Sequence, residues 1–199
     1  MRGWNFLVLL MRRVCMDNLF LAIFPDDEAA ARISQLARRL RRPHDLQGAP
    51  LPRNRLHVSL YAFGAFAELP ASVVAAAQEI VSRVKGTSFD AVFDRVQSFD
   101  GKRKRSDEEK GNPFVLLGGQ GASGLISFQR LISRTVAEAR ASRPLARSYT
   151  PHVTMLYDAK IVDEHPVASI GWRVREFVLV QSLVGRGVYK KLARWPLHD

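Results

Sequence analysis

The order of the predicted strands and helices constrains the fold of this chain more than any other feature. Apolar residues at helical spacing predict three helices, at 29–41, 70–84 and 125–140. Apolar runs bounded by Gly and Pro predict seven strands, at 19–24, 55–63, 88–98, 113–117, 148–157, 172–184 and 189–196. Several strands follow one another through connections short enough for hairpins, which favours antiparallel pairing. We therefore predict an α+β fold with mostly antiparallel sheets, and not a doubly wound parallel sheet.

The first fifteen residues differ in character from the rest of the chain. An apolar run from Trp4 to Met11 is followed by Arg12 and Arg13, but this run is too short to cross a bilayer. It also lacks the small-residue cleavage site of a secretory signal. Met16 stands directly before the first predicted strand. We therefore expect residues 1–15 to be an N-terminal extension or tail, residues 16–199 to form one domain, and Met16 to be the natural start.

The net charge of +11 favours a partner that bears phosphate, because 23 of the 30 basic residues are arginine, whose geometry matches phosphate. The sequence has no Gly-rich phosphate loop and no G-x-G-x-x-G, so an enzyme of nucleoside triphosphates or dinucleotides is unsupported. The one cysteine, Cys15, excludes a disulfide within the chain and a cysteine-type zinc cluster. These features fit a reducing cytoplasm, and we expect a monomer that does not bind membranes.

Two segments, 55–61 and 150–157, resemble each other although they lie in different halves of the chain. Both are predicted strands, and both contain histidine, valine and then a β-hydroxyl residue. Side chains alternate between the two faces of a strand. In the first segment this rule places one set of side chains on one face, namely Leu56, Val58, Leu60 and Ala62. It places the alternate set on the opposite face, namely His57, Ser59, Tyr61 and Phe63. In the second segment it predicts Val153, Met155 and Tyr157 on one face, against His152 and Thr154 on the other.

Each predicted strand thus presents an imidazole beside a hydroxyl, on the face opposite an apolar one. Two such strands side by side would surround a small anion with two imidazoles and two hydroxyls. Opening a cyclic phosphate needs a base that takes a proton from water and an acid that protonates the leaving ribose oxygen. Histidine serves in either role near neutral pH, and hydroxyls can donate to the phosphate oxygens where charge develops.

The two H-x-[ST]-x motifs resemble those of the 2H phosphoesterase superfamily. More narrowly, residues from about 17 to 197 are similar to the bacterial 2′-5′ RNA ligase family, also called RNA 2′,3′-cyclic phosphodiesterase. The resemblance rests on four stretches, which are Leu19–Pro25, His57–Leu60, Pro151–Met155 and Phe177–Ser182 with the later Gly187, Tyr189 and Trp195–Leu197. It implies a bilobal α+β fold, with two mostly antiparallel sheets around a central cleft and the helices outside.

The resemblance also implies an activity and a set of residues. The activity is hydrolysis of RNA 2′,3′-cyclic phosphate ends to 2′-phosphates without metal or organic cofactor, with 2′-5′ RNA ligation in some members. Carried over, His57 is the proton donor and His152 the proton acceptor, while Ser59 and Thr154 hold the phosphate.

This sequence departs from the family pattern at two places. Ser59 stands where threonine is more usual, which keeps the hydroxyl and loses the stiffness of a β-branched side chain. Many members have an arginine shortly after the second motif, where this chain reads Leu156, Tyr157, Asp158. A phosphate contact is then either missing or supplied by Lys160, Arg186 or a loop residue. A specialised substrate would follow from that change.

Several alternatives stay open at the level of sequence. Tyr61 and Phe63 could stack on a base of single-stranded RNA or pack between lobes, and Tyr157 and Arg186 are further candidate contacts. The basic run 102–105 could follow an RNA backbone, but acids follow it directly and a solvated loop is favoured. A metal site is disfavoured, because the histidines have no obvious third ligand beyond Asp158.

Three further histidines, His44, His165 and His198, lie beside prolines or near the C-terminus, and we expect them at the surface. Two rival functions also stay open. One is phosphodiesterase action on a small cyclic nucleotide or an ADP-ribose cyclic phosphate. The other is a non-catalytic module that binds RNA or nucleotides.

Overall fold

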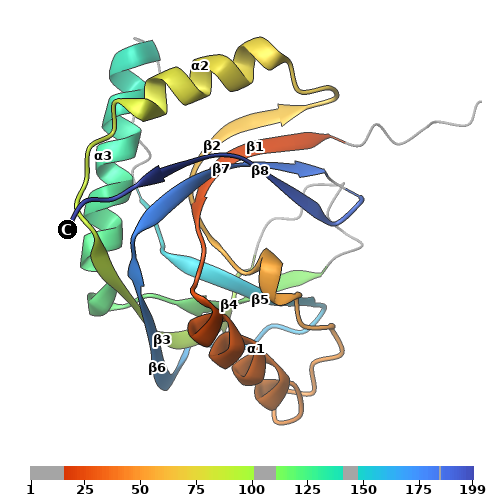
Figure 1. Ribbon diagram of the computed structural model, residues 1–199. Helices are drawn as coiled ribbons and strands as arrows, with labels where there is room; N and C mark the ends of the chain where they lie inside the picture. The colour runs from red at the N-terminus through yellow and green to blue at the C-terminus, as the bar shows by residue number, and fades with distance from the viewer. Residues whose placement is uncertain (1–15, 101–110, 141–147, 184) are drawn as a thin grey trace, which may run out of the picture.

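Two four-stranded antiparallel sheets form the framework of the protein, as Figure 1 shows for this computed structural model. The structure describes residues 16–100, 111–140, 148–183 and 185–199. The first sheet has the order β2-β1-β7-β8, with β1 Asp17–Ile23, β2 Val58–Phe66, β7 Glu176–Leu183 and β8 Val188–Pro196. The second has the order β5-β4-β3-β6, with β3 Phe89–Ser98, β4 Asn112–Leu117, β5 His152–Asp158 and β6 His165–Val174. The predicted α+β class with antiparallel sheets is confirmed.

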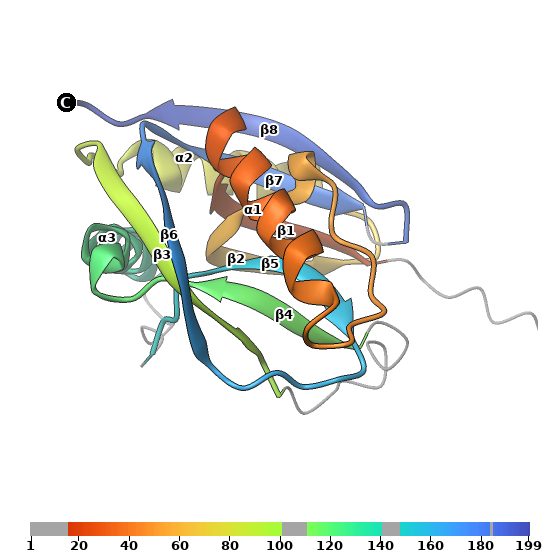
Figure 2. The ribbon, with the colours of Figure 1, turned by 90° about the horizontal axis from the view of Figure 1, so that it is seen from below.

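The described part of the chain has three α-helices, α1 Asp27–Arg41, α2 Ala71–Ser82 and α3 Ser123–Arg140, and two short 3-10 helices, η1 Arg53–Arg55 and η2 Gln120–Ala122. Asp26 caps α1 by accepting the Ala29 N–H at 2.8 Å. Helix α1 contacts β5 and β6, whereas α3 contacts β2, β3 and α2. Figure 2 shows α1 at the front and α3 at the left edge. In the described part of the chain, no helix is long and apolar enough to cross a membrane.

The central strand β1 is buried on both faces. Leu19, Leu21 and Ile23 belong to the main hydrophobic core, which extends through both sheets and the helices. Phe20 and Ala22 lie on the opposite face with Val178 and Val180 of β7. A strand that is covered on both faces needs a continuous apolar run, not an alternating one, and this explains the run from Leu19 to Phe24.

One strand was not predicted from the sequence. The expected strand at 172–184 is in fact the end of β6 and the whole of β7, which belong to different sheets and are separated only by Arg175. Pro166 and Gly171 interrupt the strand signal of β6. Both residues are tolerated because β6 is an edge strand and pairs only with β3.

Other expectations need correction or fall outside the described residues. The predicted strand at 55–63 begins only at Val58, because Arg53–Arg55 forms η1, so His57 directly precedes β2. Residues 1–15 and the basic run 102–105 lie outside the described residues. Of the three histidines expected at the surface, His198 is exposed, whereas His44 and His165 are half-buried with ring centroids 4.8 Å apart.

Candidate active site

The two motif strands share an irregularity that alternation cannot predict. On β2, Ser59 pairs with Ala22 and Tyr61 with Leu21, so Leu60 is an extra, bulged residue. On β5, Thr154 pairs with Val115 and Leu156 with Phe114, so Met155 is bulged. In both strands the bulge therefore follows the β-hydroxyl directly. A β-bulge re-aims the side chains that follow it.

On β2 the bulge turns the aromatic residues away from the hydroxyl. Tyr61 lies opposite Leu21 and packs against the main core, and Phe63 is buried in that core. Their ring centroids are 5.1 Å apart. The prediction that Tyr61 and Phe63 share a face with His57 and Ser59 is therefore wrong, because the predicted alternation takes no account of the bulge at Leu60. The packing interpretation of these two residues holds.

On β5 the bulge has the opposite consequence. Leu156, not Tyr157, joins Val153 on the core side, because Leu156 lies opposite Phe114. Tyr157 pairs with Pro113 and so lies on the same face as Thr154 and His152. Its side chain is 37% exposed. The predicted face of Tyr157 was wrong, and the correction strengthens it as a candidate substrate contact. We use "site face" for the face of the first sheet that carries Ser59 and, in the second sheet, for the face that carries His152 and Thr154.

His57 and His152 are held in the same way. Nδ1 of His57 lies 2.8 Å from the carbonyl oxygen of Arg55, and Nδ1 of His152 lies 2.8 Å from that of Thr150. A carbonyl only accepts, so each Nδ1 must carry the proton and donate it. Nε2 of each ring is then the atom left for proton transfer. The two motifs thus present chemically equivalent imidazoles, each fixed by the backbone two residues before it.

Aromatic rings pack against both imidazoles. The ring of His57 lies 5.3 Å from Phe20, 6.1 Å from Phe24 and 5.3 Å from Tyr189, centroid to centroid. The ring of His152 meets Phe99 edge-on at 4.8 Å. These rings displace water, and loss of water disfavours the charged imidazolium.

The electrostatics of the site follow from this burial. Desolvation lowers the pKa of His57 below its usual value, and the neighbouring charges of His152 and Arg55 lower it further, against the opposing effect of the hydrogen bond to Arg55. Desolvation likewise lowers the pKa of His152, opposed by its hydrogen bond to Thr150. The charge of His152 is among the causes that lower the pKa of His57, so the two imidazoles lie close enough for one to act on the other.

The site lies where the two sheets meet. Strands β2 and β5 are edge strands of different sheets and contact each other. Tyr149 crosses this boundary, and its hydroxyl donates to the carbonyl oxygen of Ser59 at 2.9 Å. Burial raises the pKa of Tyr149, so this hydroxyl stays protonated and remains a donor. One hydrogen bond thereby connects the hydroxyl residue of the first motif to the segment that leads into His152.

Tyr149→Phe tests this connection. We expect the free energy of unfolding to fall by about 1 kcal/mol through loss of one hydrogen bond. We also expect kcat to fall severalfold, because the two motifs are no longer held together there. Tyr61→Phe is the matched control, since Tyr61 packs against the main core. Chemical denaturation and steady-state kinetics measure the two effects. Wild-type values of both in Tyr149→Phe would show that the hydrogen bond does not couple the motifs.

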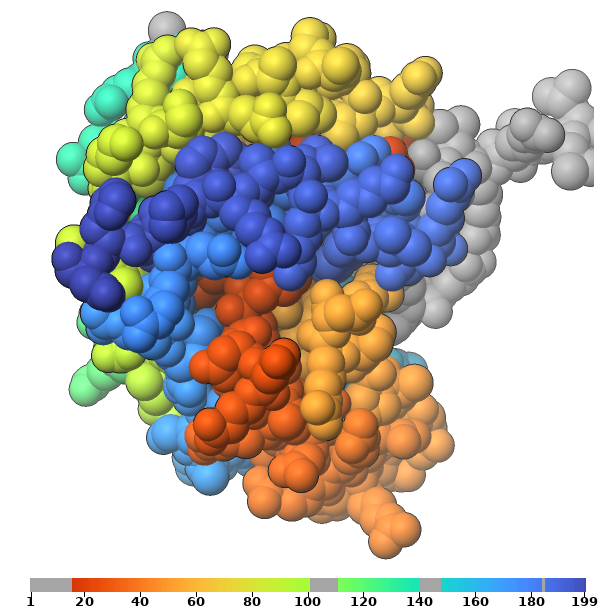
Figure 3. Space-filling model, in the orientation of Figure 1, coloured from red at the N-terminus to blue at the C-terminus, as the bar shows by residue number. Residues whose placement is uncertain are grey.

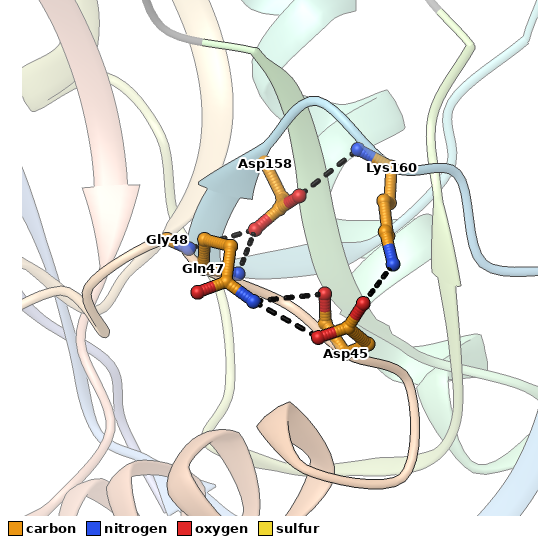
Figure 4. A network of polar contacts seen from close by, with 5 residues as sticks. All are labelled: Asp45, Gln47, Gly48, Asp158 and Lys160. Carbon is orange, nitrogen blue, oxygen red and sulfur yellow. Dashed lines mark hydrogen bonds and ion pairs between the residues drawn. The ribbon is translucent and has the colours of Figure 1, made fainter.

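Asp158, in the stretch after the second motif, has a structural role (Figure 4). The Asp158 carboxylate is buried and accepts backbone N–H groups from Gln47 at 2.6 Å, Gly48 at 2.7 Å and Lys160 at 2.9 Å. Desolvation acts to raise the pKa of Asp158, but these N–H donors outweigh it, so the pKa is lowered. Asp158 therefore fixes the loop after α1 against the end of β5, and its oxygens are occupied.

Neither candidate to replace the expected arginine belongs to a motif strand. Lys160 forms an ion pair with Asp45 in the network of Figure 4. Arg186 is exposed in the turn between β7 and β8. Among the described residues, no group of three or more His, Cys, Asp or Glu is placed to hold a metal ion.

Two cations beside His57 were missed. The Cζ atom of Arg55 lies 5.2 Å from the ring centroid of Tyr189, and Nζ of Lys191 lies 4.1 Å from that of Phe24. Both of these rings pack against His57. Arg55 stands two residues before His57, so its proximity was available from the sequence. Lys191 could be found only from the pairing of β7 with β8.

Comparison with known proteins agrees with this geometry. The model of the family described as the 2′-5′ RNA ligase superfamily matches residues 25–186. The chain belongs to the 2′-5′ RNA ligase superfamily. The resemblance drawn from its motifs is thereby confirmed. A search of curated proteins found no match to this sequence.

Solved structures extend the comparison of this superfamily member to the whole fold. Escherichia coli LigT in its apo form has 26% sequence identity and a TM-score of 0.67, over 92% of this chain and 99% of LigT. A protein described as a phosphoesterase has 25% identity and a TM-score of 0.66, over 92% and 99%. TT0787 of Thermus thermophilus has 20% identity and a TM-score of 0.68, over 92% and 98%, which shows a shared fold.

Proposed function

We propose that this protein hydrolyses 2′,3′-cyclic phosphate ends of RNA to 2′-phosphates, with His57 and His152 as acid and base and without a metal ion. The observation that carries the proposal is the placement of two imidazoles at the starts of two edge strands that contact each other, each held through Nδ1 by a carbonyl two residues earlier. Proton transfer needs two such groups facing one region, whereas binding alone does not. Membership of the superfamily supports an RNA substrate.

The reaction proceeds in one balanced step. Water attacks phosphorus and forms a new P–O bond, while Nε2 of His152 takes a proton from that water. The bond between phosphorus and the 3′ oxygen breaks, and Nε2 of His57 gives its proton to that oxygen. The products are a 2′-phosphate and a free 3′-hydroxyl. His57 must therefore begin as imidazolium and His152 as neutral imidazole.

Ser59 and Thr154 hold the phosphate in this proposal. Both lie on the site face next to the histidines, and Ser59 is exposed while Thr154 is half-buried. Their hydroxyls can donate to the non-bridging oxygens, where negative charge increases in the transition state. E. coli LigT has been crystallised with 3′-AMP and with phosphate, which supports a phosphate site in this fold. Tyr157 is the aromatic residue placed to contact the rest of the substrate.

The deciding experiment uses a short RNA that ends in a 2′,3′-cyclic phosphate, with chelator present. We expect a 2′-phosphate end as the product, and we expect added metal to have no effect. Adding an RNA with a 5′-hydroxyl tests for 2′-5′ ligation, in which that hydroxyl takes the place of water. Turnover of a small cyclic nucleotide but not of RNA would support a different substrate. Salt-dependent RNA binding without any product would instead support a non-catalytic binding module.

The dependence of the rate on pH checks the roles of the two histidines. The reactive form has His152 neutral and His57 protonated, so kcat/KM rises through the lower apparent pKa of the pair and falls through the higher one. Both pKa values are lowered in the free protein. We therefore expect a bell-shaped profile whose maximum lies below the ordinary histidine value of 6.5. A flat profile between about pH 5 and 8 would contradict the two-histidine mechanism.

A further inference from the structure

Two cations flank His57 in a way that the proposed reaction does not use. Arg55 lies over the ring of Tyr189, and Lys191 lies over the ring of Phe24. Each cation therefore contacts an aromatic ring that also packs against the imidazole of His57. Contact with an aromatic face holds a cation in place without neutralising its charge. Figure 3 shows η1 next to β8, the elements from which these two cations come.

The strand pairing places Lys191 on the side of the reaction. Lys191 lies opposite Val180, which shares its face with Phe20 and Ala22. Ala22 in turn pairs with Ser59, so Lys191 lies on the site face. The adjacent Lys190 lies opposite Gln181, on the other face of the sheet.

Both cations are also available to an anion. In the described part of the chain, neither Arg55 nor Lys191 forms an ion pair with a carboxylate. The buried Nε of Arg55 has no hydrogen-bond partner there either. Arg194, on the same strand as Lys191, is paired with Glu176 at 3.4 Å. Two cations without a carboxylate partner among the described residues therefore lie beside the rings that pack against His57.

The direction of proton transfer determines where a substrate would extend. The acid protonates the 3′ oxygen, which remains on the ribose, so the ribose lies on the His57 side of phosphorus. In RNA the next phosphate is attached to the 5′ oxygen of that same ribose. We therefore expect this next phosphate on the His57 side of the site, toward the face of the first sheet near Arg55 and Lys191.

We propose that Arg55 and Lys191 form a second phosphate subsite, which binds the phosphate on the 5′ side of the terminal ribose. The inference rests on the proposed function and narrows its substrate class to oligonucleotides that end in a cyclic phosphate. Arg55 supplies the guanidinium fork that matches phosphate oxygens, and Lys191 supplies a second positive charge. A nucleoside 2′,3′-cyclic monophosphate lacks the second phosphate, so it cannot bind to Arg55 or Lys191 in this way.

The test compares adenosine 2′,3′-cyclic monophosphate with the adenosine dinucleotide that ends in a 2′,3′-cyclic phosphate. We expect wild type to prefer the dinucleotide in kcat/KM by at least about tenfold, the value of one charged hydrogen bond. Arg55→Met and Lys191→Met should each reduce this preference by about tenfold. Lys190→Met is the matched control, with an unchanged preference. Each variant is assayed at the pH of its own maximum rate, because loss of Arg55 also raises the pKa of His57.

The outcomes separate the two proposals. If wild type hydrolyses both probes and neither methionine variant changes the ratio, the subsite is overturned and the proposed function stands. If wild type shows no preference for the dinucleotide, the subsite is likewise overturned. If wild type hydrolyses neither probe, the proposed function fails and the subsite fails with it. Thermal melting confirms that each variant is folded, and the single variant at Lys191 tests the subsite independently of Arg55.

Discussion

His152→Asn and His57→Asn are each expected to lower kcat by about 10²–10⁴-fold, the contribution of a positioned acid or base. Asparagine can still donate a hydrogen bond to the backbone carbonyl that holds each ring, at Thr150 for His152 and at Arg55 for His57. Unlike histidine, asparagine cannot take up or release a proton near neutral pH. The fold should therefore survive while turnover is lost, which single-turnover hydrolysis of the cyclic-phosphate RNA measures directly.

Two comparisons make this result specific. His44→Asn is the matched control, because His44 is half-buried but pairs with His165 and not with either motif. It should retain the wild-type rate. The double variant at His57 and His152 should lose little more than the worse single variant, since acid and base act in one step. Near wild-type rates in both single variants would exclude the two-histidine mechanism.

Asp158→Ala is expected to lower the free energy of unfolding by about 3 kcal/mol or more. The substitution leaves the N–H groups of Gln47, Gly48 and Lys160 without their acceptor, and each buried unsatisfied group costs about 1–3 kcal/mol. The loop has little freedom to adapt, because a Cβ at Gly48 would lie 2.0 Å from the carbonyl oxygen of Tyr157. Urea denaturation measures the loss.

The matched control removes the neighbouring exposed carboxylate. Asp45→Asn breaks the ion pair with Lys160, and an exposed ion pair is worth only about 0–1 kcal/mol. Equal losses in Asp158→Ala and Asp45→Asn would contradict the assigned role of Asp158.

The contribution of Asp158 also has a definite pH dependence. Its pKa in the folded protein is below the ordinary value of 3.8. A lowered pKa means that the stabilisation is fully present above 3.8 and is lost as pH falls through the folded-state pKa. The difference in stability between wild type and Asp158→Asn should therefore be constant from about pH 5 to 7 and shrink only in stronger acid.

The sequence was sufficient for the fold class and for the two imidazole–hydroxyl pairs, because both depend on local patterns. Burial of Leu56, Val58 and Val153 follows directly from alternation. The alternation rule fails at the residue after each hydroxyl, because Leu60 and Met155 are bulged. Both bulged residues are apolar, so the sequence pattern does not reveal them. On β5 this irregularity determines the faces of the residues that follow, whereas on β2 a second bulge, at Phe63, shifts the register again before Gly64.

Long-range pairing accounts for most of what was missed. Lys191 reaches the site only through the register of β8 on β7. Strand β6 was missed because proline and glycine weaken its local signal, while its pairing with β3 stabilises it.

The topology of the first sheet has a consequence for synthesis on the ribosome. The second sheet is built from one continuous stretch of chain, from β3 to β6, whereas the first combines β1 and β2 with the much later β7 and β8. A growing chain can therefore assemble the strands around His152 while β7, the second partner of β1, has not yet been made. Tyr189, which packs against His57, comes from the last strand of all. A nascent chain would thus acquire its base before its acid, and it would have no hydrolytic competence until translation is nearly complete.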